Sequence, residues 1–123
     1  MRKLNIGKVS TEALVTLFAD LSKRQGDALI VDDTRRSNRI FYRILDIDSE
    51  LRARGPEARL KLKALLIHPN PFVRMNAAVK ILGLVPQEAR SILQEIDDAR
   101  VQPEALHAGM KLLAFDRGEW VPD

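Results

Sequence analysis

The residues best suited to chemistry form an arginine cluster between positions 35 and 52: Arg35, Arg36, Arg39, Arg43 and Arg52. Three of them, Arg35, Arg39 and Arg43, recur every four residues, so on a helix they would share one face. A row of guanidinium groups can bind carboxylates or phosphates. We therefore expect the cluster to bind an acidic protein surface or, as an alternative, the phosphate backbone of a nucleic acid. A solvated helix face with local ion pairs is the third interpretation.

Two further patterns could carry enzymatic or metal chemistry, and we interpret both as structural. Glu104 and His107 have the Glu-x-x-His spacing of carboxylate-bridged di-iron bundles, which need a second such motif. The chain has two histidines and no cysteine, so we expect no metal, no cofactor and no disulfide. Asp46, Asp48 and Glu50 could serve acid–base catalysis, but neighbouring carboxylates are usually only solvated. No nucleophile or phosphate-loop motif is readable, and we expect a protein that is not an enzyme.

Length and charge set the class of protein. A chain of 123 residues predicts one domain, and no apolar run is long enough for a membrane span, so we expect a cytoplasmic protein. Residues 1–63 carry 14 Lys and Arg against 9 Asp and Glu, whereas residues 64–123 carry 6 against 8. This asymmetry favours acidic partners for the N-terminal half.

Apolar residues at helical spacing, with helix caps and prolines, predict about six helices in three antiparallel pairs. A loose leader (1–9) precedes a helix that begins at Ser10 and ends near Arg24 to Gly26. Residues 27–33 are ambiguous and are interpreted as the opening of the second helix, which runs to 54, or as a separate helical turn. Helices are then expected at 56–67, 71–84, 86–99 and 103–117, with a tail at 118–123 in which Trp120 covers the last helix pair.

The segment from His68 to Val85 organises these expectations. Asn70 is suited to cap a helix, and Pro71 to occupy its first position. Val73 and Ala77 begin the apolar stripe of that helix, and the small Ala77 would let a neighbouring helix approach closely.

The same segment resembles the second helix of a HEAT-type repeat, through Asn70-Pro71, Val73-Arg74, Ala77-Ala78 and Ile81-Leu82. The resemblance implies a right-handed α-α superhelix of the ARM/HEAT type, with 10–54 as a divergent capping pair and 56–117 as two HEAT-like pairs. It also implies that Arg74 pairs with a carboxylate of a neighbouring helix, Asp97 or Asp98 or one in the second helix. Removing Arg74 would cost about 3–5 kcal/mol if that pair is buried and about 0–1 kcal/mol if it is exposed, and we predict the larger range.

A second resemblance rests on residues 65–96 together with the closing Gly118-Glu119-Trp120. These stretches are similar to a family of small bacterial proteins known only as a domain of unknown function. The resemblance implies an all-helical fold and transfers no catalytic residue. We therefore expect a non-enzymatic protein–protein interaction module, with nucleic-acid binding as the alternative and a toxin-neutralising immunity-type protein as a remote one.

Overall fold

The computed structural model describes residues 5–123, and within them every regular element is a helix. The elements are η1 (Ile6–Lys8), α1 (Thr11–Ile30), α2 (Thr34–Ala53), α3 (Pro56–Leu60), η2 (Lys61–Ile67), α4 (Pro71–Ile81), α5 (Pro86–Asp98) and α6 (Glu104–Asp116). The prediction of an all-α fold with about six helices is confirmed. The expected leader is a 3-10 turn at residues 6–8, and its residues 1–4 lie outside the described part.

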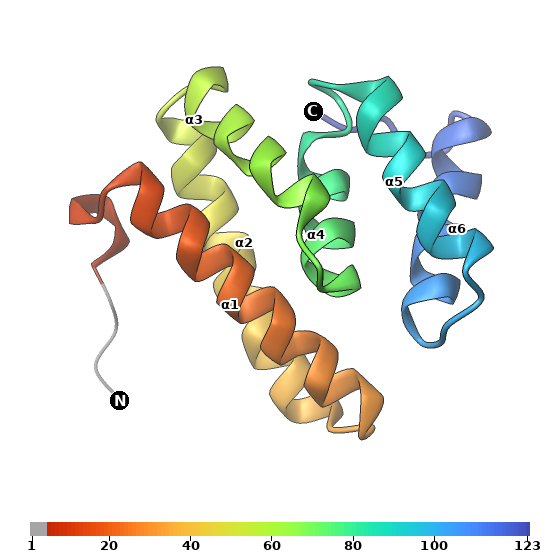
Figure 1. The fold of residues 1–123 in the computed structure, drawn as a ribbon. Coiled ribbons are helices and arrows are strands. Elements are labelled where there is room, and N and C mark those ends of the chain that lie inside the picture. The colour runs from red at the N-terminus through yellow and green to blue at the C-terminus, as the bar shows by residue number, and fades with distance from the viewer. Residues whose placement is uncertain (1–4) are drawn as a thin grey trace.

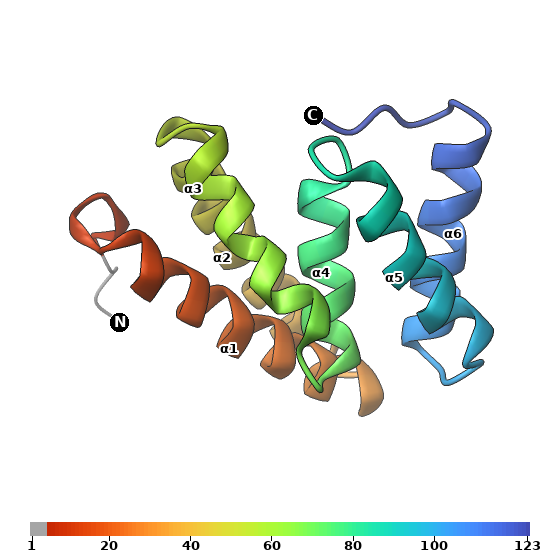
Figure 2. The ribbon, with the colours of Figure 1, turned by 45° about the horizontal axis from the view of Figure 1, so that its top comes forward.

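The helices follow one another in pairs across the molecule (Figures 1 and 2). α1 packs against α2, η2 packs against α4, and α5 packs against α6. α4 is the central helix, because it also contacts α1, α5 and α6. Its residues Val73, Ala77, Ala78 and Ile81 have no exposed surface, so the helix predicted to organise the chain lies in the core.

Local signals set most helix starts where the sequence predicted them. The Ser10 hydroxyl accepts a hydrogen bond from the Ala13 N–H at 3.1 Å, and the Asn70 side chain accepts from Phe72 and Val73 at 2.9 and 3.2 Å. Both bonds satisfy N–H groups that have no partner inside the helix. Pro71 occupies the first turn of α4, as do Pro56 in α3 and Pro86 in α5.

Four predicted boundaries are wrong. α1 does not end near Gly26 but continues to Ile30, so residues 27–30 are its last turn rather than the opening of α2. The chain then turns, and the Asp33 side chain caps α2 by accepting from Arg36 N–H at 3.1 Å. Residues 56–67 divide into a short α-helix and a 3-10 helix. α4 ends at Ile81 rather than 84, and α6 begins after Pro103, which is its cap.

None of the helices in the described residues combines the length and the apolar character that a membrane crossing requires. The core instead joins apolar stripes from all three pairs, such as Leu14 and Phe18 of α1, Ile44 of α2 and Leu93 of α5. Burial of a side chain of this size stabilises the fold by roughly 1.5–3 kcal/mol.

Candidate functional site

α2 is packed along one side only, which leaves a broad exposed face. Its buried positions are Ser37, Ile40, Ile44, Ile47, Asp48 and Leu51, a single helical stripe. Arg35, Arg39, Tyr42 and Arg43 lie on the other side and are exposed, with Tyr42 65% exposed. We call these four residues the arginine face. In the described part of the chain, none of its three arginines forms an ion pair with a carboxylate.

The other two predicted arginines differ from these residues in their surroundings. Arg36, seven residues before Arg43, is exposed on the same side of α2, but it pairs locally with Asp33, at 3.6 Å between Nε and Oδ2. Arg52 is nine residues beyond Arg43, and at about 100° per residue the two side chains leave the helix on opposite sides. The structure therefore divides the predicted cluster into an exposed face and a separate residue, Arg52, which turns toward α4.

The three carboxylates of α2 also lie in different surroundings. Asp46 is exposed, whereas Asp48 is only 4% exposed and accepts a hydrogen bond from Arg52 Nε at 3.0 Å. Glu50 accepts from Arg54 Nε at 2.8 Å. Each carboxylate faces a different environment, so the acid–base grouping considered from the sequence does not form.

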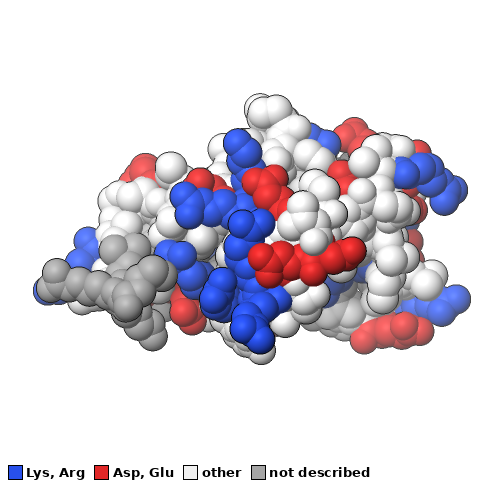
Figure 3. Space-filling model, turned by 90° about the horizontal axis from the view of Figure 1, so that it is seen from below, with Lys and Arg blue, Asp and Glu red and all other residues white. Residues whose placement is uncertain are grey.

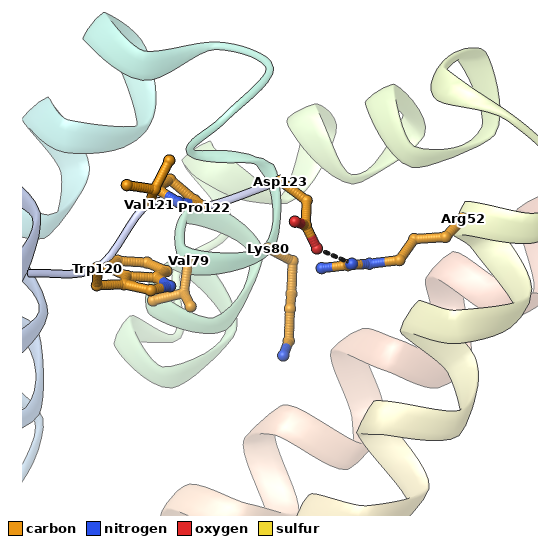
Figure 4. A pocket seen from close by; sticks show the side chains of 7 residues that line it. All are labelled: Arg52, Val79, Lys80, Trp120, Val121, Pro122 and Asp123. Carbon is orange, nitrogen blue, oxygen red and sulfur yellow. Dashed lines mark hydrogen bonds and ion pairs between the residues drawn. The ribbon is translucent and has the colours of Figure 1, made fainter.

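Arg52 lines a cleft between α2 and α4 of about 130 Å³, which we call the basic cleft. Its lining residues are Arg52, Val79, Lys80, Trp120, Val121, Pro122 and Asp123. Figure 4 shows Lys80 and Arg52 reaching into this space from α4 and α2, with the Asp123 carboxylate paired to Arg52. The C-terminal segment thus forms part of the wall.

Arg59 of α3 links two lining residues of the basic cleft, Lys80 and Asp123, through their backbone oxygens. The residue is 8% exposed, and its Nη2 donates to the Lys80 carbonyl at 2.8 Å. Its Nη1 donates to the Asp123 backbone oxygen at 3.2 Å. Its Nε has no hydrogen-bond partner, and neither has Oδ1 of the buried Asp48.

Two cations of the basic cleft have shifted proton affinities. The hydrogen bond to Asp123 raises the pKa of Arg52, with further support from Asp48. Burial lowers the pKa of Lys80, since removal from water disfavours the charged form. Lys80 is half-buried and makes no ion pair with any described residue.

Trp120 fixes the start of the tail on α6. Its ring packs edge-on against Phe115 with 6.4 Å between ring centroids, and Lys111 Nζ lies 4.8 Å from the centre of the Trp120 ring. The backbone N–H of Trp120 donates to the Ala114 carbonyl at 3.2 Å. Beyond Trp120 the tail crosses to α4 and α2. The Asp123 backbone lies so close to Gly83 that a Cβ atom on residue 83 would overlap it.

The prediction for Arg74 is wrong. Its Nη1 donates to the carbonyls of His68 at 2.8 Å and Pro69 at 3.0 Å, and no carboxylate of the described chain forms an ion pair with it. A guanidinium six residues past a turn can reach back to the turn's carbonyl groups, so a distant acid is not needed. Arg74 closes the 68–70 turn rather than joining two helices.

Glu104 and His107 occupy different environments. Glu104 is 6% exposed with Oε1 lacking a hydrogen-bond partner, whereas His107 is exposed. Within residues 5–123, no three or more His, Cys, Asp or Glu side chains gather in a way that could hold a metal ion.

Sequence reasoning missed Asp48, Arg59, Lys80 and Asp123 as members of one site. Arg52 and Asp123 are 71 positions apart, and the sequence carries no local pattern that would join them.

Two comparisons find similar proteins. The family model of a domain of unknown function, DUF2019, matches residues 12–116. The crystal structure of protein RPA1889 from Rhodopseudomonas palustris CGA009 is similar, with 37% sequence identity and a TM-score of 0.92, over 98% of this chain and 100% of that one. No curated protein matches the sequence.

Proposed function

Because the chain belongs to the DUF2019 family, a domain of unknown function, we propose a function from its own surfaces: a non-enzymatic module that binds an acidic partner protein. The binding surface in this proposal is the arginine face of α2.

One observation carries the proposal: three arginines stand one helical turn apart on an exposed face and have no ion-pair partner among the described residues. Like charges at this spacing repel by about 0.2–0.5 kcal/mol per pair. An acidic surface would relieve that repulsion and accept bidentate hydrogen bonds from the guanidinium groups.

The exposed Tyr42 supports a protein partner, because Tyr and Arg are the side chains most often found at the energetic centres of protein interfaces. The exposed Asp46 is on the same side of α2 and would repel a phosphate backbone. Figure 3 shows a face on which Lys and Arg gather in a band with Asp and Glu side chains beside them. Such mixed charge suits a protein surface better than a uniform polyanion.

Two finer parts of the proposal follow from the sequence. We propose that the three helix pairs form an ARM/HEAT-like right-handed superhelix, supported by their succession and by the central position of α4. The proposed absence of catalysis is supported by the dispersal of Asp46, Asp48 and Glu50 into separate environments. The cytoplasmic location and the immunity-type role stay predictions.

The test is affinity capture from the native lysate with wild-type protein and with an Arg35→Gln/Arg39→Gln/Arg43→Gln variant as baits. A control variant, Lys23→Gln/Lys61→Gln/Arg117→Gln, removes the same charge from exposed positions elsewhere. We expect a stoichiometric protein that survives nuclease, binds the control and is lost from the first variant. A partner retained by both variants would contradict the proposal.

Nucleic-acid binding is the second candidate, favoured by the exposed ring of Tyr42 beside arginines, since bases stack on such rings. It predicts that nuclease removes the captured material. It also predicts that affinity for a single-stranded oligonucleotide falls with log salt at a slope of about −0.7 per phosphate contact.

A further inference from the structure

The tail residues Trp120–Asp123 form one wall of the basic cleft, and they lie along α4 and α2 as an extended peptide would lie in a binding groove (Figure 4). The chain has no helix there, and its two ends are held by different chemistry. Trp120 rests on Phe115 and under Lys111, whereas Asp123 meets Arg52 through its carboxylate and Arg59 through its backbone oxygen. The groove therefore offers an aromatic seat at one end and a carboxylate seat at the other.

The basic cleft has a cation that the tail does not use. Lys80 lines the cleft, is half-buried and makes no ion pair with a described residue. A ligand with a further carboxylate would pair with this ammonium group, which the tail leaves unpaired.

Two residues of the tail are largely exposed: Val121 is 81% exposed and the Asp123 side chain 66% exposed. Arg52, Arg59 and Lys80, which lie beside the tail, belong to α2, α3 and α4, and each of these helices also packs against other helices of the chain. We expect those helix contacts to keep the three residues in place when another segment replaces the tail.

We propose that the groove in which residues 120–123 lie, together with the adjoining basic cleft, is a binding site for a short extended segment of a partner protein, with an aromatic residue followed three positions later by a carboxylate. Residues 120–123 occupy the same site in the free protein. The aromatic seat distinguishes this ligand from a small anion, which would use only the cationic end. The site is separate from the arginine face, and the proposal does not depend on it.

The probe is a fluorescent peptide Gly-Glu-Trp-Val-Pro-Asp, which copies residues 118–123. It is titrated into the full-length protein and into an Asp123→Asn and a Trp120→Ala/Asp123→Asn variant. The protein's own tail competes with the added peptide for the site. Variants that weaken binding of the tail should therefore raise the apparent affinity for the peptide, by about tenfold in the double variant. Asp123 is exposed, so the single variant keeps its fold and gives a smaller change in the same direction.

Adding Arg52→Gln to the double variant should lower peptide affinity at least about fivefold, whereas Arg24→Gln on α1 should not change it. The arginine-face triple variant should bind the peptide as wild type does, which separates this site from the proposed function. The proposal is overturned if weakening the tail leaves peptide affinity unchanged, or if Arg52→Gln has no effect.

Discussion

Gly26 of α1 lies directly against the ring of Phe72 of α4, with no room between them for a side chain. A Cβ at position 26 would overlap the Cγ and Cδ2 atoms of that ring. Phe72 is 3% exposed and lies in the first turn of α4, so its ring has no space into which to retreat. This contact sets how closely the first helix pair approaches the central helix.

We expect Gly26→Ala to destabilise the protein, although alanine is the better helix former. The favourable helix propensity is worth about 1 kcal/mol, whereas overpacking costs typically about 1–3 kcal/mol. Urea unfolding should show a net loss of up to about 2 kcal/mol in the free energy of unfolding.

Gly7→Ala is the control, because a Cβ there meets only ordinary contact with Asn5. In a double-mutant cycle, Phe72→Leu should recover part of the loss caused by Gly26→Ala. A stabilising effect of Gly26→Ala would show that α1 and α4 adjust without strain.

A second overpacking prediction concerns Ala77 on the buried face of α4. The residue has no exposed surface, so Ala77→Leu should cost about 1–3 kcal/mol through overpacking. Ala13→Leu on the exposed side of α1 is the control and should be near neutral. Thermal unfolding of the two variants makes the comparison, and a neutral Ala77→Leu would mean that α4 has space on this face.

The features of α4 were predictable because they are local. Asn70 and Pro71 set the start of the helix within three residues, and Val73 and Ala77 mark its buried side by spacing alone. Gly26 shows the limit of the same reasoning. A glycine near the end of an apolar stripe favours a helix stop, but here it serves a contact with Phe72, 46 positions away, and α1 continues past it.

The arginine face and the basic cleft differ in the same way. The spacing of Arg35, Arg39 and Arg43 on one helix is enough to predict that they share a face. The cleft requires knowledge of where the tail returns, and Arg59 and Lys80 become neighbours only through tertiary packing. The sequence-based prediction grouped Arg52 with the other arginines of α2 because of its charge, whereas the structure shows it in the basic cleft.

Arg74→Ala should destabilise by about 1–3 kcal/mol, because the guanidinium is a charged donor to two turn carbonyls. The partners are neutral, so the loss should be the same at low and high salt. Urea unfolding at two ionic strengths checks this, with Arg74→Lys as a variant that keeps the charge but not the fork geometry. A loss that shrinks at high salt would point to a carboxylate partner instead.

Asp116 on α6 should add an acid-dependent contribution to stability. Its hydrogen bonds from Arg90, at 2.9 and 2.6 Å, lower the pKa of the carboxyl group. A lowered folded-state pKa stabilises above the unfolded value, and the stabilisation is lost as pH falls through the folded value. As pH falls below about 4, the ordinary aspartate pKa, wild type should therefore lose stability more steeply than Asp116→Asn.

Carboxyl NMR titration gives the direct check on Asp116. Arg90→Gln should raise the pKa of Asp116 toward its ordinary range, and Arg24→Gln should leave it unchanged. If the Asp116 carboxyl group had the same pKa with and without Arg90, the predicted effect of the Arg90–Asp116 ion pair would be contradicted.

Lys80 should reduce stability at neutral pH. Burial lowers its pKa from the ordinary value of 10.5, opposed by Asp48 and aided by the nearby cations Arg52 and Lys111. At a pH below its folded-state pKa, Lys80 is charged in both the folded and the unfolded protein. The folded protein then carries the full free-energy cost of removing the ammonium group from water. As pH rises through the folded value toward 10.5, the folded state binds fewer protons than the unfolded state, and stability increases.

We therefore expect Lys80→Met to be more stable than wild type at pH 7, with a difference that narrows near pH 10. Methionine retains the backbone carbonyl that accepts from Arg59, so the link between α3 and α4 through this hydrogen bond is preserved. Lys61→Met, at an exposed position, is the control and should show no such pH dependence. Denaturant unfolding at both pH values makes the measurement. A Lys80→Met variant that is less stable at pH 7 would mean that attraction to the buried Asp48 outweighs desolvation, so that Lys80 is part of the fold's own ion network.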